Sequence, residues 1–355
     1  MAEGKGRVIF MQHGLNDNYK CFHGLITNLV GGNGKKYMDL GVISTGTRPQ
    51  LAEPPRNGNR GYEGYGKSGI HYSDTYLDYL KEQFGNADNP NLYLIQSLNK
   101  LTENNCNVLI RTEFSTGVES LDEQQSQMSY IAGLIGGQNA DVCFIGHSMG
   151  GLASLNYAMD YKRENPLKDV MVITIDTPYF KNDYSLAAWK LAGREKYNNN
   201  GEAAGQRVGY ANRDLACVAC SDKRVVLEEL YKKWCLYRET YNDVAVYAAA
   251  VSMYSENSGE TASRKGDGIV DVPAQLGREK YGAGRVYPGV VALPVVYGGK
   301  FASKNPMTVV EPSVSIANIR DLDNPYHHCN TPSLSEVATL VDEVICRHKR
   351  QSAEE

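Results

Sequence analysis

Short apolar runs separated by amphipathic stretches are the dominant pattern of the chain. Five runs are rich in Val and Ile and are bounded by polar or turn residues: VIFM (8–11), NVLI (107–110), DVCFI (141–145), DVMVITI (169–175) and VAVYAAAV (244–251). Their apolarity is continuous rather than alternating, which is typical of strands covered on both faces in a parallel sheet. We therefore predict five strands of a mostly parallel sheet.

Helical patterns fall between and after these runs. Ser120 and Glu123 form a capping box that opens a helix through about Ile135, and MGGLASLNYAMDYKREN directly follows the third run. Ser333 and Glu336 form a second capping box. The apolar positions after it keep helical spacing: Leu334, Val337, Val341, Val344 and Ile345. Strands that alternate with helices predict an α/β fold with helices on both faces of the sheet.

Two segments break this alternation. Residues 31–100 are longer than one crossover needs, and residues 180–243 hold both tryptophans. We expect a single domain over residues 1–355 in which both segments are insertions that form a cap, the second being a lid. Within 225–241, one helical face suits a lid over an acyl pocket or, alternatively, an amphipathic helix that packs on its own core: Leu227, Leu230, Tyr231, Trp234 and Tyr241.

Charge and hydropathy exclude several partners. The 355 residues carry a formal net charge of −4 without a basic run, so neither nucleic acid nor an anionic membrane surface is expected to bind. No apolar stretch reaches the roughly 18 residues of a membrane span. The first apolar run starts at Val8, which leaves no room for a signal peptide. We expect a cytoplasmic protein as the chain stands, with a mature secreted form as the alternative. The oligomeric state has no signature in the sequence.

The cysteines do not predict a metal site. Eight cysteines are too dilute for a disulfide scaffold in a chain of this length. Cys217, Cys220 and Cys235 form a cluster, but no histidine lies near them in sequence to complete a zinc site. We expect free thiols or a local disulfide there, and no metal.

Residues 61–68, GYEGYGKS, match the phosphate-loop pattern G-x-x-x-x-G-K-[ST]. That loop needs a buried strand before it and a helix after it to receive the phosphates. The preceding RPQLAEPPRNGNR holds three prolines and no apolar run. We interpret the match as a chance occurrence and expect no nucleotide cofactor.

A second motif has the required context. Residues 146–150, GHSMG, follow the run 141–145 directly and precede a helix, as G-x-S-x-G does around a nucleophilic serine. The sharp turn strains the backbone at Ser148 and lifts its hydroxyl clear of the sheet, and only glycines fit on either side. The start of the helix directs partial positive charge toward the same point. We predict that Ser148 is a nucleophile.

The base and the acid should follow the serine in the order acid, then histidine. His328 is the preferred base and His327 the alternative, because both lie on the loop before the last helix; His348, near the end of that helix, is expected to be structural. For the acid, Asp267 in GDGIVD is preferred and Asp271 is the next choice.

Asp176, at the end of the run 169–175, is the serious alternative for the acid because a triad acid can also come from that strand. The oxyanion needs backbone donors. We expect one from the amide of Met149, directly after Ser148. The other should come from the amide of Leu15, where His13 and Gly14 let the loop after the first strand turn inward.

These blocks together resemble the α/β-hydrolase superfamily, and within it the lipase and carboxylesterase branch. FMQHGLND, CFIGHSMGG, VITIDTPYF, GDGIVDVP and YHHCNTPSLSEV appear in that family's order. The resemblance implies an α/β-hydrolase fold and hydrolysis of carboxylic esters through an acyl-enzyme, with no cofactor. Ser148 would attack, His328 would move the proton and Asp267 would orient His328. Asp176 is a departure, because many relatives carry a glycine before Thr-Pro.

The substrate stays open at this level. A lipid or fatty-acyl ester is the leading hypothesis, and the same fold could instead act on a thioester, an amide or a glycosylphosphatidylinositol acyl chain. A non-catalytic binding protein is a different hypothesis, although the candidates for serine, acid and base are all present. A nucleotide-dependent enzyme would depend on the phosphate-loop match.

Overall fold

The computed structural model describes the sheet, the helices that cover it and part of the loops at its carboxyl edge. The described residues are 5–14, 19–32, 36–46, 68–85, 87–113, 121–180, 226–253, 266–267, 270–279, 283–298, 325–328 and 330–352. None of the helices in these ranges combines the length and the apolar character that crossing a bilayer requires.

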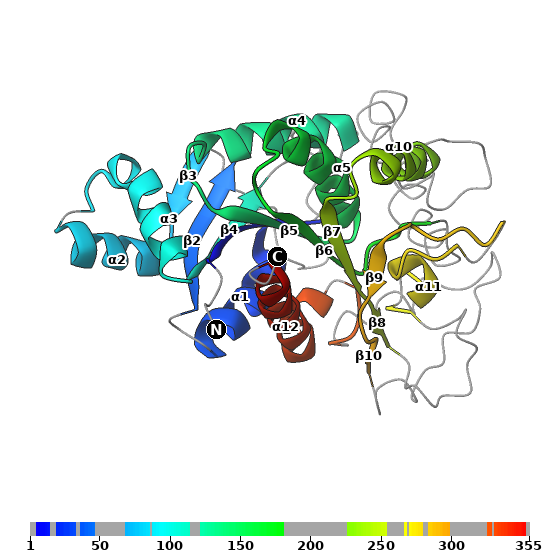
Figure 1. Cartoon of the computed structure of the whole chain (residues 1–355). Coiled ribbons are helices and arrows are strands. Elements are labelled where there is room, and N and C mark those ends of the chain that lie inside the picture. Colours follow the sequence, from blue (N-terminus) through cyan, green and yellow to red (C-terminus); the bar gives the residue numbers. More distant parts are fainter. Residues whose placement is uncertain are drawn as a thin grey trace, which may run out of the picture.

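An eight-stranded sheet forms the centre of the molecule (Figure 1). Its strand order is β3 (Gly69–Tyr72), β2 (Tyr37–Ser44), β4 (Asn107–Glu113), β1 (Arg7–Gln12), β5 (Asp141–His147), β6 (Val170–Ile175), β7 (Val244–Ala249) and β9 (Val290–Ala292). All neighbours pair in parallel except β2 and β3, which are antiparallel. Beside it, β8 (Val251–Ser252) pairs with β10 (Val296–Tyr297).

The five predicted strands are confirmed, and they are neighbours: β4, β1, β5, β6 and β7 form the middle of the sheet. Their residues are buried on both faces, which explains their continuous apolarity. The strands that the pattern does not predict lie at the two sides. β3 is only partly buried, β9 is largely exposed, and β2 is interrupted by a register shift between Asp39 and Gly41.

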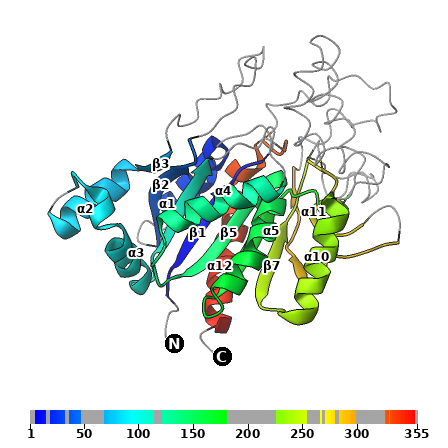
Figure 2. The same ribbon diagram turned by 90° about the horizontal axis from the view of Figure 1, so that it is seen from above.

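Helices cover both faces of the sheet (Figures 1 and 2). One face carries α2 (Asp74–Phe84), α3 (Leu94–Glu103), α4 (Leu121–Leu134), α5 (Met149–Glu164) and α10 (Val226–Thr240), and the other carries α1 (His23–Gly32) and α12 (Ser335–Ser352). Alternate residues of the central strands enter the two cores: Phe10 and Phe144 face the first set of helices, Ile9 and Cys143 the second. The predicted fold class, an α/β-hydrolase fold with a mostly parallel sheet, is confirmed.

The remaining described helical elements are short, each of one turn. These are η1 (Tyr19–Phe22), η2 (Pro90–Leu92), α11 (Val272–Gln275) and η7 (Thr331–Ser333). The last one corrects the prediction of a capping box at Ser333. Ser333 ends the η7 turn and Leu334 is extended, so α12 begins only at Ser335. The predicted apolar face of this helix is buried, including Val337, Val341 and Ile345.

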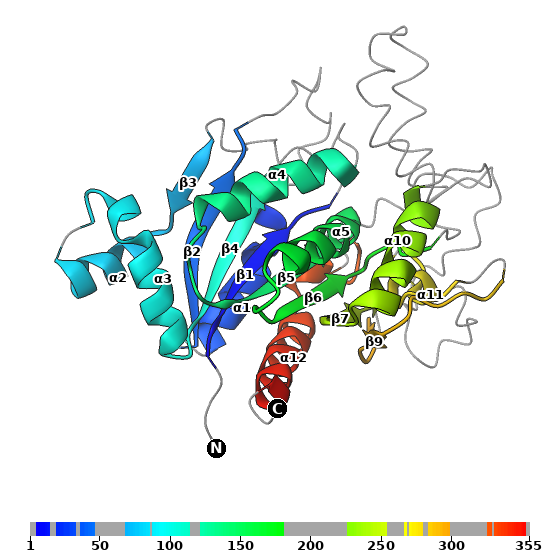
Figure 3. The same ribbon diagram turned by 45° about the horizontal axis from the view of Figure 1, so that its top comes forward.

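The two expected insertions differ from the prediction. Residues 37–44 and 69–72 are strands of the central sheet, so this part of 31–100 belongs to the core and not to a cap. Within 180–243, α10 packs beside α5 and β7 (Figure 3), and Trp234 is fully buried. This helix therefore packs on the protein's own core, although Tyr241 at its end is half exposed. Residues 181–225, the rest of the expected lid, and 61–67 of the phosphate-loop match lie outside the described residues.

The topology positions a site at the carboxyl ends of β1 and β5. From β1 the chain first builds one side of the sheet, with β2, β3 and β4, and then crosses to build the other side, with β5, β6 and β7. Ligands of open α/β sheets bind where the strand order reverses in this way. Gln12 pairs with Gly146 at this point, so Gly14 and Ser148 follow two adjacent strand ends.

Candidate active site

Ser148 occupies the sharp turn between β5 and α5. Its backbone has φ 56° and ψ −128°, in a region that residues other than glycine rarely adopt, and its side chain is half-buried. A Cβ on Gly146 would lie 2.3 Å from the carbonyl oxygen of Gly150, and one on Gly150 would lie 2.2 Å from that of Gln12. Only glycines fit at these two positions, so the strained strand–turn–helix of the G-x-S-x-G motif is present.

The loop after β1 lies directly against Ser148. A Cβ on Gly14 would be 2.8 Å from Cβ of Ser148 and 3.3 Å from its Oγ, so a larger residue would not allow this approach. On the other side, Met149 opens α5, where the first amides of a helix have no intrahelical acceptor. An oxyanion hole requires backbone amides beside the serine, and two backbone segments meet here. Leu15 lies outside the described residues, and the donor roles of Leu15 and Met149 stay predictions.

His328 and Asp267 are joined by two hydrogen bonds. Nδ1 of His328 lies 2.6 Å from Oδ2 of Asp267, and the amide of His328 donates to the Asp267 carbonyl oxygen at 2.9 Å. Asp267 is fully buried, and its Oδ1 accepts a third hydrogen bond from the amide of Val270 at 2.7 Å. A carboxylate on Nδ1 holds the ring in the tautomer that leaves Nε2 available as a base.

His147 links the pair of His328 and Asp267 to the turn that holds Ser148. Its ring packs on the ring of His328 with centroids 4.7 Å apart, and Ser148 is the next residue in the chain. His147 is buried, and its Nε2 lies 3.5 Å from the hydroxyl of Thr331. Burial, and then the charge of His328, lower the pKa of His147 well below its ordinary value, so this ring is neutral at neutral pH.

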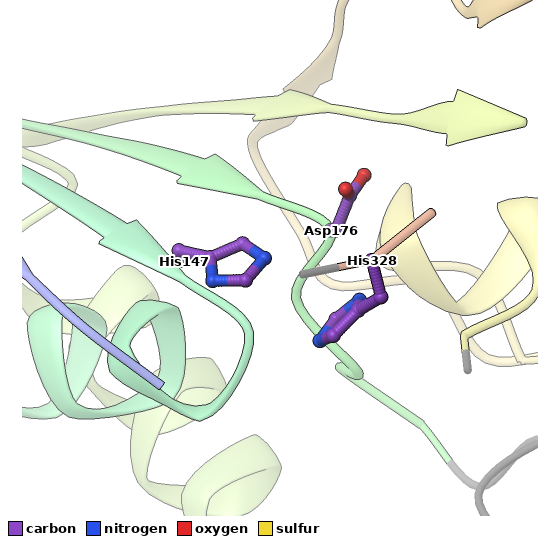
Figure 4. Close-up of side chains that lie close together, drawn as sticks. All are labelled: His147, Asp176 and His328. Carbon is purple, nitrogen blue, oxygen red and sulfur yellow. The ribbon is translucent and has the colours of Figure 1, made fainter. Parts of the chain in front are cut away.

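Asp176 directly follows the end of β6, close to the ring of His328. Figure 4 shows its side chain close to those of His147 and His328, beyond the ends of β5 and β6. It is fully buried, its φ is 52°, and its Oδ1 accepts a hydrogen bond from the amide of Val251 at 3.0 Å. Burial, and then the charge of Asp267, raise the pKa of Asp176 well above its ordinary value.

Asp271 and His327 have different surroundings from the bonded pair. Asp271 is the N-cap of α11, where its Oδ1 accepts a hydrogen bond from the amide of Ala274 at 2.9 Å. This is a structural role in the turn that follows Asp267. His327 is buried, but the histidine whose ring bonds to Asp267 is His328.

His348 lies at the opposite edge of the sheet. Its Nδ1 is 3.1 Å from the hydroxyl of Tyr247, and its Nε2 is 3.0 Å from Oδ2 of Asp169, which precedes β6. Asp169 also forms an ion pair with Arg7 at the start of β1. The structural role expected for His348 agrees with these contacts.

A small group of side chains in the described part of the chain could hold a metal ion. His147, Asp176 and His328 each place one potential ligand atom within 4.8 Å of the other two. Nδ1 of His328 is already bonded to Asp267, so an ion would have to take Nε2 of that ring. Of the three clustered cysteines, only Cys235 is described, and it is a free thiol.

Sequence reasoning did not assign a role to His147 or Thr331. Both lie within motifs that it used: His147 is the second residue of GHSMG, and Thr331 follows the histidine loop. A polar residue at the buried carboxyl end of a central strand lies at the same edge of the sheet as Ser148. That position is the signal that would have singled out His147.

No family model matches the chain, and no curated protein matches it. The chain is similar to solved structures at low identity, among them the following three. The product of gene lin2722 from Listeria innocua has a TM-score of 0.42 at 15% identity, over 82% of this chain and 83% of that one. A presumed cell surface hydrolase from Lactobacillus plantarum has a TM-score of 0.41 at 16% identity, over 82% of each chain. Phospholipase PlaB from Legionella pneumophila has a TM-score of 0.40 at 14% identity, over 99% of this chain and 64% of that one. At such scores the likeness carries no functional argument, so any assignment depends on the chain's own residues.

Proposed function

We propose that this protein is a serine hydrolase that cleaves carboxylic esters through an acyl-enzyme. The observation that carries the proposal is the bonded pair of Asp267 and His328, whose ring packs on the residue before Ser148. Ser148 sits in a strained turn at the reversal point of the sheet. A serine, an imidazole and a buried carboxylate in this order are the parts that acyl transfer needs.

The proposed reaction uses only groups of this chain and water. Oγ of Ser148 attacks the ester carbonyl carbon while Nε2 of His328 takes its proton. The tetrahedral oxyanion is held by the amide of Met149 and, we expect, by that of Leu15. When the carbon–oxygen bond breaks, His328 gives the proton to the leaving alcohol. Water then attacks the acyl-enzyme, again with His328 as the base, and releases the acid and free Ser148.

We further propose a lipid or fatty-acyl ester as the substrate. The resemblance of GHSMGG and its neighbouring blocks to lipases and esterases supports this substrate class. The helix α10 does not support it, because its apolar face is buried in the protein's own core. The dependence of kcat/KM on acyl-chain length therefore decides this part of the proposal.

Ser148→Ala should abolish labelling by a fluorophosphonate and lower kcat/KM for p-nitrophenyl esters by about 10⁴-fold or more. The matched control is Ser154→Ala, a buried serine further along α5 that should keep full labelling and turnover. Turnover by a folded Ser148→Ala protein would refute the nucleophile. Activity on a thioester or an amide but not on any ester would change the proposed substrate class from esters to that compound class. Equal kcat/KM for all chain lengths would remove the fatty-acyl preference.

A further inference from the structure

We infer that Glu113 is a positioning residue of the oxyanion hole, which acts on the loop after β1 through the ring of His13. Glu113 is the last residue of β4, and nothing in the proposed reaction uses it. Its effect on turnover rests on the proposed function, whereas its hold on the loop is a property of the folded protein and can be tested without turnover.

One carboxyl oxygen of Glu113 meets both described ends of this loop. Its Oε2 accepts a hydrogen bond from the amide of Tyr19 at 2.9 Å and lies 3.9 Å from Nε2 of His13. His13 directly follows β1, and Tyr19 opens the η1 turn. Glu113 comes 94 positions after Tyr19, on the strand that pairs with β1. It therefore ties the two ends of the loop to the sheet.

Burial makes this arrangement specific. His13 is fully buried and Glu113 is nearly so. A buried carboxyl group and a buried imidazole have both given up water, so they are stable only where protein groups replace those contacts. The backbone of Glu113 is held as well, because its carbonyl oxygen accepts a hydrogen bond from the amide of Thr45 at 3.0 Å, directly after β2. The side chain thus reaches the loop from a fixed point of the sheet.

The ring of His13 carries the effect of Glu113 to the backbone beside Ser148. Nδ1 of His13, across the ring from the nitrogen that Glu113 contacts, donates to the carbonyl oxygen of Gly14 at 3.0 Å. A carbonyl oxygen only accepts, so Nδ1 carries the hydrogen. A peptide group is planar, and the direction of this carbonyl sets the direction of the amide that follows it. In the proposed function that amide, of Leu15, is an oxyanion donor.

Gly14 is also where the loop meets the nucleophile. A Cβ on Gly14 would lie 3.3 Å from Oγ of Ser148. Oxyanion donors act at about 2.7–3.1 Å from the developing charge, so a small rotation of the peptide group after Gly14 would misplace one. The hold of Glu113 therefore contributes to the transition state more than to substrate binding. Its loss should lower kcat and leave KM largely unchanged.

Three variants test the effect on turnover of p-nitrophenyl esters. Glu113→Ala should lower kcat about tenfold at unchanged KM, less than the roughly 10²-fold loss of a whole oxyanion donor. Glu113→Gln should regain most of this kcat, because its amide oxygen can still accept from the amide of Tyr19. Glu113→Ala combined with His13→Ala should lose no more kcat than His13→Ala alone, because the two residues act as a unit.

The matched control is Asp169→Asn, which removes the acidic partner of Arg7 at the opposite edge of the sheet. It should lower stability but keep kcat. Additive losses of kcat in the combined variant would overturn the inference. So would a loss in Glu113→Ala that appears only in KM. If wild type is labelled by a fluorophosphonate and Glu113→Ala keeps full kcat, the hydrolase stands and the inference is overturned.

The second measurement does not depend on turnover. NMR gives the hydrogen-exchange rate of the Tyr19 amide relative to that of Ile110, in the buried middle of β4. This ratio should rise about tenfold in Glu113→Ala, as expected for one lost hydrogen bond, and should not rise in Asp169→Asn. An unchanged ratio in Glu113→Ala would overturn the inference. A raised ratio in a protein that no fluorophosphonate labels would support the hold of Glu113 on the loop and refute the hydrolase.

Discussion

The two edges of the central sheet each hold a histidine–aspartate pair, buried at the carboxyl edge and partly buried at the amino edge, in opposite electrostatic surroundings. At the carboxyl edge, His328 bonds to Asp267, with Asp176 as a second carboxyl group and Ser148 nearby. At the amino edge, His348 bonds to Asp169. There the extra partner of the aspartate is a cation, Arg7, in an ion pair.

The difference shows in the aspartates that accompany each pair. The pKa of Asp176 is raised by burial and by Asp267. Burial would also raise the pKa of Asp169, but hydrogen bonds and charges from His348 and Arg7 hold it below its ordinary value. At the amino edge a cation beside the aspartate makes a structural ion pair, whereas at the carboxyl edge the neighbour is a second acid. The residue types alone do not distinguish these roles.

The largest expected effect separates the two histidines. His328→Ala should lower kcat/KM for p-nitrophenyl esters by about 10⁴-fold, because it removes the base that takes the serine proton. His348→Ala should leave kcat/KM unchanged and lower only the free energy of unfolding. Steady-state kinetics and urea unfolding of both variants check this. Comparable losses of turnover in the two variants would mean that both edges serve the reaction, and the comparison would fail.

The next effect concerns the ion pair at the amino edge. Asp169→Asn leaves the guanidinium of Arg7 buried without its counter-charge, so it should lower the free energy of unfolding by about 3 kcal/mol. Urea denaturation measures the change, and Asp141→Asn is a control, a partly exposed aspartate whose Oδ1 accepts from the Asp169 amide. A loss in Asp169→Asn no greater than in the control would show that Arg7 does not depend on Asp169.

The smallest effect is the opposite pH dependence of the two edges. The raised pKa of Asp176 means that stability falls as pH rises above the ordinary aspartate value of 3.8, until the folded-state pKa is reached. Asp176→Asn should remove this loss, and its stability relative to wild type should grow by about 1.4 kcal/mol per pH unit at most. The lowered pKa of Asp169 has the reverse sign: its contribution is present above 3.8 and is lost as pH falls below that value.

Urea unfolding from pH 2 to pH 9 on wild type, Asp176→Asn and Asp169→Asn measures both slopes, because the Asp176 difference changes above pH 3.8 and the Asp169 difference changes below it. The stability of Asp176→Asn relative to wild type should grow as pH rises, and the deficit of Asp169→Asn should shrink as pH falls below 3.8. If the two differences have the same sign, the contrast between the edges is wrong.

Local patterns predicted the centre of the fold well and its margins poorly. The five middle strands, β4, β1, β5, β6 and β7, are buried on both faces. Burial on both faces requires apolar residues at successive positions, so these strands can be recognised in the sequence as apolar runs. β2 and β3 lie at the side of the sheet, where partial burial allows polar residues such as Asp39 and His71. Such strands look like loop in a single sequence. For this reason, the sequence pattern places residues 37–44 and 69–72 within the expected insertion of residues 31–100.

The candidate site divides in the same way. Ser148 could be found because its turn depends on its immediate neighbours, Gly146 and Gly150, and on the strand and helix beside it. The choice between His327 and His328, or between Asp267 and Asp176, could not. Adjacent histidines have the same spacing, and the bond that separates them joins residues 61 positions apart.

The sequence by itself determined an α/β protein with five central strands and a serine held in a strained turn, because close-range sterics and burial set those features. Only the tertiary structure decided which histidine meets which aspartate, that α10 packs into the core, and that two acidic groups lie together behind the histidine. Those outcomes depend on how segments far apart in the sequence converge on the sheet, where burial strengthens each charge.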